Sequence, residues 1–192
     1  MNEDIIMIVS GWKEMLERSD SIPHREFVDL MCFFYVMQES GEYGREVDLR
    51  LLSFEEAGRR GLSDPDKLFE AALKNTIRHF PLCIRDHGDG MCVLTNEKGV
   101  FGATAMIYPD GLVKTAEKIG GDMVVVPLSI HEVVCMPADR ADPDIVHDLL
   151  MESIIEREQQ DSQENVLSSS IYYYDSARKH IGILVTDGEM VQ

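Results

Sequence analysis

The sequence has 192 residues, which is enough for one domain that buries a hydrophobic core without a disulfide or a metal ion. Its 35 acidic and 18 basic residues give a net charge of −17, which disfavours direct binding to the phosphates of DNA or RNA and suits a basic protein partner. No apolar run approaches the length of a membrane span and no signal peptide is evident, so we expect a cytoplasmic protein that does not enter a membrane.

The four cysteines lie far apart among apolar residues, and none has the Cys-x-x-Cys spacing of a metal or redox site. Isolated cysteines of this kind usually behave as small buried hydrophobic residues. We therefore expect no metal and no cofactor, and we expect all four thiols to stay reduced: Cys32, Cys83, Cys92 and Cys135.

The first quarter of the chain predicts strands. Residues 4–12, DIIMIVSGW, form a short β-branched run that ends at Ser-Gly, and a polar turn follows over 12–26. Residues 27–38 are apolar at both alternating sets of positions, which favours a strand covered on both faces, with a buried helix as the competing interpretation. Residues 45–52 alternate between apolar and charged, so we expect a half-exposed strand in a hairpin with 27–38.

Three later stretches carry helix signals. Residues 65–80 begin with an Asp64 cap and Pro65, and residues 143–158 repeat this pattern after Asp142. A shorter helix is predicted within 108–121, ending at a glycine pair. The side chains expected to face the core are Leu68, Phe69, Ala72, Leu73, Thr76, Ile77 and Phe80 in the first helix, and Ile145, Val146, Leu149, Leu150 and Ile154 in the second.

The remaining apolar runs predict strands in pairs. Residues 90–96 and 100–108 flank Glu-Lys-Gly, which indicates a hairpin, although the second run is equally compatible with a helix. The other two antiparallel pairs are 122–127 with 131–137, and 169–175 with 179–185. The charged stretch 85–90 is typical of a turn, and residues 157–170 predict a mobile polar link.

These elements together predict the fold class. Hairpins interspersed with helices indicate an α+β domain with a mainly antiparallel sheet and about three helices packed on it. We expect residues 1–192 to form a single domain.

The strongest candidate for chemistry is the pair His131 and Glu132, within PLSIHEVVCMP. Successive side chains of a strand point to opposite faces, so the two cannot act side by side unless a bulge intervenes. We expect His131 to form a hydrogen bond near the start of the strand and Glu132 to lie at a sheet edge. Asp175 is the third catalytic candidate, although a role in capping its own turn is the simpler interpretation.

Four further residues are candidates for ligand binding: Asn96, Tyr108, Tyr172 and Tyr174. Asn96 lies where a strand meets a turn, and asparagine in this position usually forms hydrogen bonds to its own loop. Tyr172 and Tyr174 share one strand face, where aromatic side chains more often pack than stack on a ligand. No phosphate-binding glycine loop or serine-nucleophile motif is present in the sequence.

Three stretches carry a resemblance: CVLTNEKGVFGATAMIYPDGL, PLSIHEVVCMP and VLSSSIYYYD. In this order they resemble the blocks of an uncharacterised family of gut Firmicutes and their mobile elements, and IPHREFVDLMCFFYVMQESGEYG resembles the segment before them. The resemblance covers most of the chain from Ile5 onward. It implies no assigned activity and no catalytic residue.

The sequence departs from this family in two blocks. Leu128 stands where the family tends to have serine, and Ser176 where it tends to have arginine, so a site that depended on those positions is in doubt. Family members extend further at the N-terminus, which implies that this chain is either a shortened version or the C-terminal part of a longer architecture.

These observations favour a cytosolic, non-enzymatic protein that acts through protein–protein contacts. One alternative is an acidic mimic of nucleic acid that inhibits a host or defence protein, which acidic residues gathered on one face would favour. Another is a small-molecule hydrolase or metal enzyme that uses His131 with Glu132 or Asp175, which a cleft with convergent carboxylates would favour.

Overall fold

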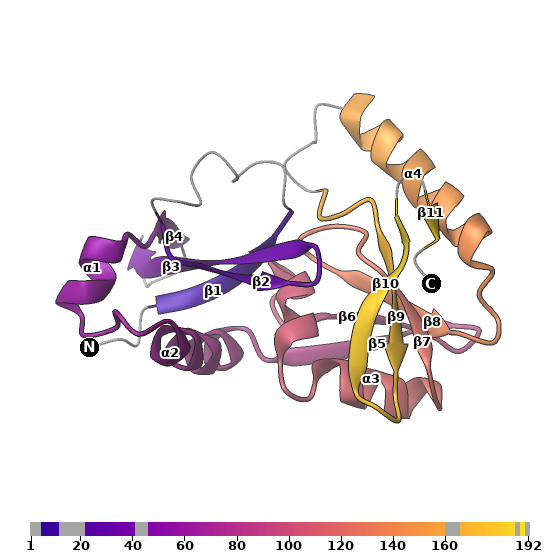
Figure 1. The fold of residues 1–192 in the computed structure, drawn as a ribbon, viewed down its shortest axis with the longest axis horizontal. Helices are drawn as coiled ribbons and strands as arrows, with labels where there is room; N and C mark the ends of the chain where they lie inside the picture. The colour runs from indigo at the N-terminus through magenta and orange to yellow at the C-terminus, as the bar shows by residue number, and fades with distance from the viewer. Residues whose placement is uncertain (1–4, 12–21, 41–45, 160–165, 187–188, 191–192) are drawn as a thin grey trace.

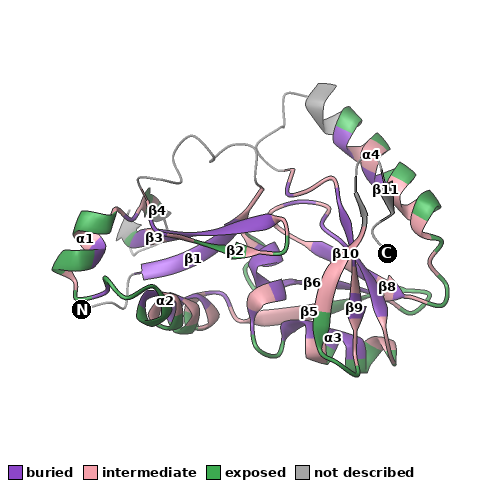
Figure 2. Cartoon of the chain, in the orientation of Figure 1, coloured by how far each residue is buried: buried purple, intermediate pink, exposed green. Residues whose placement is uncertain are grey.

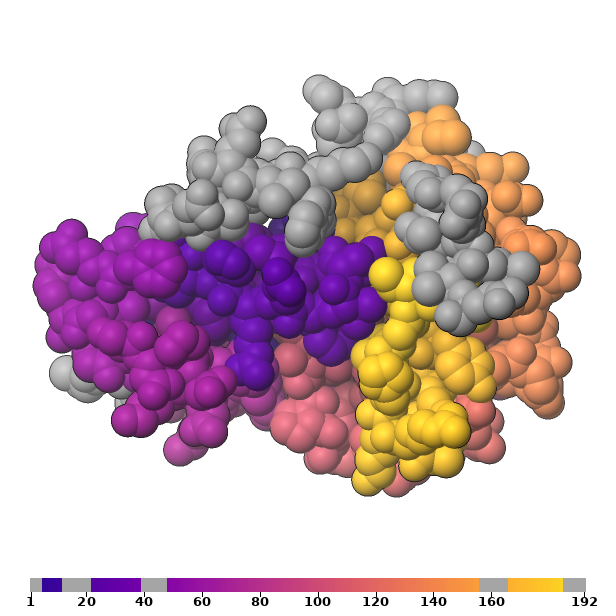
Figure 3. All heavy atoms as spheres, in the orientation of Figure 1, coloured from indigo at the N-terminus to yellow at the C-terminus, as the bar shows by residue number. Residues whose placement is uncertain are grey.

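The computed structural model describes residues 5–11, 22–40, 46–159, 166–186 and 189–190. Two antiparallel sheets with helices packed on them form the fold (Figure 1), which confirms the predicted α+β class. Figure 3 shows the segments of the first sheet, in indigo and purple, beside those of the second, in pink to yellow.

The first sheet has four strands with β3 at its centre. β1 pairs with one side of β3, and β2 and β4 pair with successive parts of its other side. The strands are β1 (Ile5–Ser10), β2 (His24–Phe27), β3 (Leu30–Ser40) and β4 (Glu46–Leu51). The predicted hairpin of 27–38 with 45–52 is confirmed, whereas β2 has three of its four residues in the stretch 12–26 that the sequence predicted to be a turn.

The second sheet has seven strands in the order β11-β10-β9-β7-β8-β6-β5, and every pairing in it is antiparallel. Its strands are β5 (Leu82–Gly88), β6 (Met91–Asn96), β7 (Met123–Val126), β8 (Val133–Pro137), β9 (Ile171–Asp175), β10 (His180–Thr186) and β11 (Glu189–Met190). The β7–β8 and β9–β10 pairs confirm two of the predicted strand pairs.

The predicted hairpin between 90–96 and 100–108 is wrong. β6 pairs instead with β5, which includes most of the stretch predicted to be a turn, and the tight connection is at Asp89 and Gly90. The second apolar run forms the 3-10 helix η2 (Gly102–Ile107), in line with the helical alternative. Five of its six residues are buried, so η2 lies inside the protein rather than at a sheet edge.

The three predicted helices follow their expected boundaries closely, whereas the short helix Phe54–Arg59 was not predicted. Asp64 accepts hydrogen bonds at the start of α2 and Asp142 at the start of α4, while Gly120 ends α3 in the left-handed conformation. The helices are α1 (Phe54–Arg59), α2 (Pro65–His79), α3 (Gly111–Ile119) and α4 (Pro143–Gln159). In the described part of the chain, no helix is both long and apolar enough to cross a membrane.

The second sheet is covered on both faces. Met123 and Val125 of β7 pack toward α3, η2 and part of the first sheet, whereas Val124 and Val126 pack toward α4. Figure 2 shows the central strands β7, β8 and β9 largely buried between α3 and α4, whereas β5 at the edge is intermediate to exposed. The polar link predicted over 157–170 begins inside α4, which extends through Gln159, and its residues 160–165 lie outside the described residues. Leu167, near the end of this stretch, is buried.

α4 buries a narrower stripe than the sequence predicts. Val146, Leu150 and Ile154 contact the core, as expected, but Ile145 and Leu149 are 58% and 60% exposed. One stripe of side chains spaced four residues apart is enough to contact a sheet face, and residues one position earlier are rotated about 100° away from it. The expectation that Ile145 and Leu149 face the core is therefore wrong.

β1 is buried from Ile5 to Val9, although among the described strands only β3 pairs with it, on one side. On the other side, the N–H of Met7 donates to the Thr76 hydroxyl at 2.9 Å, and the N–H of Val9 donates to the Thr104 hydroxyl at 3.1 Å. These threonines belong to α2 and η2. Their hydroxyl groups therefore replace the carbonyl groups that a neighbouring strand would supply.

Asn75 completes this arrangement. Its side-chain amide donates to the carbonyl of Ile5 at 3.0 Å, and both residues are buried. The Thr76 hydroxyl also donates to the carbonyl of Ala72 at 2.7 Å, so it is satisfied as donor and as acceptor. The open edge of β1 is thus joined to α2 by buried hydrogen bonds.

We expect replacement of Thr76 by valine to lower the free energy of unfolding by about 1–3 kcal/mol, because it leaves the buried N–H of Met7 without a partner. Thr115 provides a matched control, since it is fully buried and its hydroxyl also donates to a carbonyl in its own helix at 2.7 Å, that of Gly111. Chemical denaturation should show a clearly smaller loss for Thr115→Val. Equal losses in the two variants would contradict a special role for the β1 edge.

Candidate functional site

His131 lies in the loop just before β8, and its contacts are with the chain around the end of β6. Its ring Nδ1 accepts the N–H of Phe101 at 3.2 Å, and its carbonyl accepts the Thr95 hydroxyl at 2.8 Å. The rings of Phe101 and His131 are 6.0 Å apart. Because Nδ1 accepts a hydrogen bond, the proton of the neutral imidazole is on Nε2.

The segment that His131 contacts has an unusual backbone. Phe101 is left-handed, with φ 56° and ψ 26°, a conformation that bulky residues rarely adopt. At the next position, a Cβ on Gly102 would lie 2.0 Å from the Thr95 hydroxyl and 2.2 Å from the His131 carbonyl, so only glycine fits. His131 therefore stabilises a strained, closely packed turn, which is a structural role.

Glu132 interacts elsewhere. Its carboxylate forms an ion pair with Arg85 of β5 at 2.8 Å, and both side chains are well exposed. Among the described residues, no hydrogen bond or ion pair joins the side chains of His131 and Glu132. β8 itself begins at Val133, so the two candidates precede the strand on which the sequence placed them.

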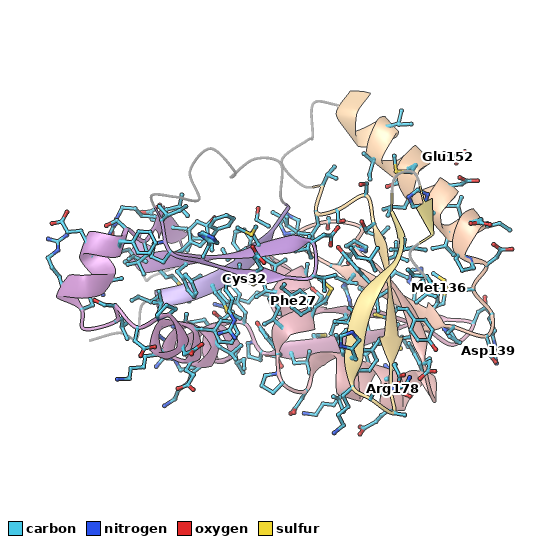
Figure 4. The ribbon with its side chains drawn as sticks, viewed as in Figure 1. Phe27, Cys32, Met136, Asp139, Glu152 and Arg178 are labelled. Carbon is cyan, nitrogen blue, oxygen red and sulfur yellow. The ribbon has the colours of Figure 1, made fainter. Side chains whose placement is uncertain are left out.

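Asp175 lies at the opposite end of the second sheet. Its carboxylate accepts the N–H and a guanidinium N–H of Arg178, both at 2.7 Å, across the β9–β10 turn. The register aligns Met123 with both Tyr174 and Pro137, which places Asp175 near the end of β8, whereas His131 lies before its start. Figure 4 shows Arg178 at the tip of this hairpin. The structure therefore does not bring His131 and Asp175 together.

Asp122 is a more heavily bonded carboxylate that the sequence did not single out. It accepts the Tyr173 hydroxyl at 2.7 Å, the Ser176 hydroxyl at 2.7 Å and the Ser176 N–H at 2.9 Å. The hydrogen bonds from Tyr173 and Ser176 lower the pKa of Asp122 to about 2. It borders a polar surface hollow of about 670 Å³ together with Gly120 and Arg140, but its own hydrogen bonds hold the β9–β10 turn.

Asn96 and Tyr108 are buried and their polar atoms bond to nearby backbone. The Asn96 side chain accepts the N–H groups of Lys98 and Gly99, both at 3.0 Å, and donates to the carbonyl of Val100 at 2.7 Å. The Tyr108 hydroxyl donates to the carbonyl of Phe80 at 2.8 Å, and burial raises the pKa of Tyr108.

Tyr172 and Tyr174 share one face of β9 and lie in the same core cluster. The Tyr172 hydroxyl donates to Asp29 at 2.6 Å, and the Ser168 hydroxyl donates to the other oxygen of the same carboxylate at 3.0 Å. Asp29 is in the β2–β3 turn, next to Val28, whose positive φ of 58° is rare for a β-branched residue. Tyr172 thus connects the two sheets, and burial raises its pKa.

The potential metal ligands do not gather in space. In the parts of the chain that the structure describes, no group of three or more His, Cys, Asp or Glu side chains could hold a metal ion. The four cysteines are free, and Cys92 lies opposite Cys135 in the β6–β8 register. Burial raises the pKa of both thiols, which makes them poor nucleophiles at neutral pH.

From β5 to β9, the side chains predicted to be catalytic or ligand-binding mostly form hydrogen bonds that stabilise turns. Residues 85–176 match the model of a family described as "Family of unknown function (DUF5688)". This confirms the resemblance to an uncharacterised family over these residues, which include all three quoted blocks from Cys92 to Asp175. No curated protein and no solved structure matches the chain.

Sequence reasoning missed two surface features of the described structure. These are the outer face of α4 and an apolar cavity beside β2 and β3. A signal for the first was present, because α4 contains more apolar residues than a single buried stripe requires. The second depends on how β2 and α1 meet, which no local pattern specifies.

We expect His131→Gln to lower the free energy of unfolding by about 1–3 kcal/mol, because it disturbs a hydrogen bond that supports the strained Phe101 turn. Glu132→Gln should add its own smaller effect, since it loses an exposed ion pair with Arg85. In a double-mutant cycle measured by chemical denaturation, the coupling energy should stay below about 0.5 kcal/mol. A clearly larger coupling would restore the pair as a candidate active site.

Proposed function

We propose that this is a cytosolic, non-enzymatic protein that acts by binding another protein, and that the outer face of α4 is the contact surface. The observation that carries the proposal is the exposure of three large apolar side chains on this helix, Ile145, Leu149 and Ile155, which are 58%, 60% and 49% exposed. Single exposed apolar residues are common, but several on one helix suggest an interaction surface.

Helical geometry places these side chains on one broad face. At about 100° per residue, Ile145 and Leu149 lie within 40° of each other, and Ile155 lies about 80° from Ile145 on its other side. Leu150 and Ile154 point to the opposite side, where they pack on the second sheet. α4, whose segment is orange at the right of Figure 3, therefore has one apolar stripe in the core and a second set of apolar side chains in solvent.

Carboxylates occupy the positions between the exposed apolar residues. Asp144, Asp148 and Glu152 are exposed, and none of them forms an ion pair among the described residues. Figure 4 shows Glu152 on the outer side of α4, away from the sheet. Because this face combines apolar and negative groups, it is complementary to a partner segment with apolar and basic residues, such as a basic amphipathic helix.

The geometry offers less support to the other two functions. An enzyme would need convergent groups, whereas His131, Glu132 and Asp175 each bond to a different part of the fold. A mimic of nucleic acid would present carboxylates without large apolar side chains between them, because phosphate backbones have none. The mixed face of α4 favours a partner surface that has apolar as well as basic residues.

The proposal is tested by affinity capture from the native host with wild-type protein and with an Ile145→Ser, Leu149→Ser double variant. We expect the wild type to capture a defined protein. The affinity of that protein for the double variant should be about tenfold or more lower, as for substitutions at the centre of an interface. Phe54→Ser is a matched control, because Phe54 is 56% exposed on a different helix.

Each captured protein would then be purified and titrated with the wild type, the Ile145→Ser, Leu149→Ser double variant and the Phe54→Ser control. Loss of binding in the double variant alone, with a basic segment of the partner at the contact, supports the proposal. Equal capture by all three proteins would contradict it. Loss of a nucleic-acid-binding protein only when Asp144, Asp148 and Glu152 are neutralised would favour the nucleic-acid mimic instead.

A further inference from the structure

An apolar cavity of about 480 Å³ opens in the first half of the chain, between β2, β3, α1 and the start of α2. This volume lies within the usual range of small-molecule sites, about 300–1,000 Å³. Its lining includes the apolar side chains of Phe34, Leu62 and Leu68 and the charged side chains of Arg25 and Asp66. It is far along the chain from α4 and shares no residue with the proposed protein contact.

The cavity arises from the way two strands share one side of β3. β2 pairs with β3 as far as Phe33, and β4 pairs with it from Tyr35 onward, so Phe34 lies at the junction between them. The chain leaves the sheet at Leu52, whose N–H donates to the Phe34 carbonyl at 2.8 Å, and then forms α1. On this side of β3, the junction is therefore bordered by Leu52 and the nearby α1 rather than by one continuous strand.

The inner surface of the cavity is apolar and well ordered by packing. Phe34, Leu68 and Leu62 are 2%, 3% and 7% exposed, and they belong to the core cluster between the first sheet and α2. An apolar group that entered would contact side chains already held in place by the fold. Its removal from water would provide most of the binding free energy.

The lining also contains one pair of opposite charges. Arg25 forms an ion pair with Asp66 at 3.2 Å, and its guanidinium lies 4.2 Å from the centre of the Phe69 ring. The side chains of Arg25 and Asp66 are 48% and 84% exposed. An exposed ion pair of this kind stabilises a fold very little, so both groups are available to a ligand that offers a better partner to each.

We propose that this cavity binds a small zwitterion with an apolar body, in the class of α-amino acids with a large apolar side chain. The ligand carboxylate accepts hydrogen bonds from Arg25, its ammonium group donates to Asp66, and its side chain packs against Phe34, Leu62 and Leu68. A carboxylate without an ammonium group is repelled by Asp66, and an amine without a carboxylate is repelled by Arg25. Because a zwitterion has no net charge, the net charge of −17 on the protein does not repel it as it would repel an anion.

Three probes with the same aromatic body test this assignment: phenylalanine, 3-phenylpropanoate and 2-phenylethylamine. Isothermal titration of the full chain, supported by ligand-observed NMR, should show phenylalanine binding about tenfold more tightly than either of the other two, because only phenylalanine forms both charge-assisted contacts. Asp66→Asn should remove its advantage over 3-phenylpropanoate. Arg25→Gln should remove its advantage over 2-phenylethylamine.

Asp110→Asn is the matched control, because Asp110 is also an exposed carboxylate near a helix start, 2.9 Å from its partner Lys114, and it does not line the cavity. This variant should bind all three probes as the wild type does. Binding of 3-phenylpropanoate as tight as that of phenylalanine, or no binding of any probe at millimolar concentration, would overturn the proposal. An equal loss in Asp110→Asn would overturn it as well.

Discussion

The outer edge of β1 is a constraint on which the packing of the first sheet against α2 and η2 depends. Thr76 and Thr104 accept the N–H groups that would otherwise face an absent strand, and Asn75 donates to a β1 carbonyl. A buried strand edge with unpaired groups costs free energy, so β1 can be central to the fold only while α2 and η2 are in place. The hydrophobic core also joins the two sheets, since Val9 of β1 packs in one cluster with Leu94 and Tyr172 of the second sheet.

This constraint explains why so many polar residues have structural roles. His131 supports the turn that leads into η2, and the η2 residue Thr104 in turn caps β1. Tyr172 reaches from the second sheet to Asp29 in the first. Groups engaged in this way are poorly placed for chemistry, whereas the outer face of α4 and the cavity beside Arg25 are open to other molecules.

The sequence predicts structural features that depend on local interactions, such as helix starts, but not those that depend on contacts between residues far apart in the chain. Asp64 and Asp142 mark helix starts because a capping side chain bonds to its own first turn. β5 was missed because its Arg-Asp-His-Gly end looks like a turn, and only pairing with β6 makes it a strand. Likewise, the apolar periodicity of α4 does not show which side of the helix packs on the sheet, so it could not show that Leu149 is exposed. The alternation of residues around His131 could not show that β8 begins at Val133, two residues after His131.

Native-state hydrogen exchange at the amides of Met7 and Val9 tests the central claim most directly. If the threonine hydroxyl groups pair these amides, they should exchange as slowly as the paired amides in the middle of β3, near the limit set by global unfolding. The matched comparison is with the outer edge of β5, the last strand of the second sheet's order. Exchange of the Met7 and Val9 amides as fast as the unpaired amides of that edge would contradict the account.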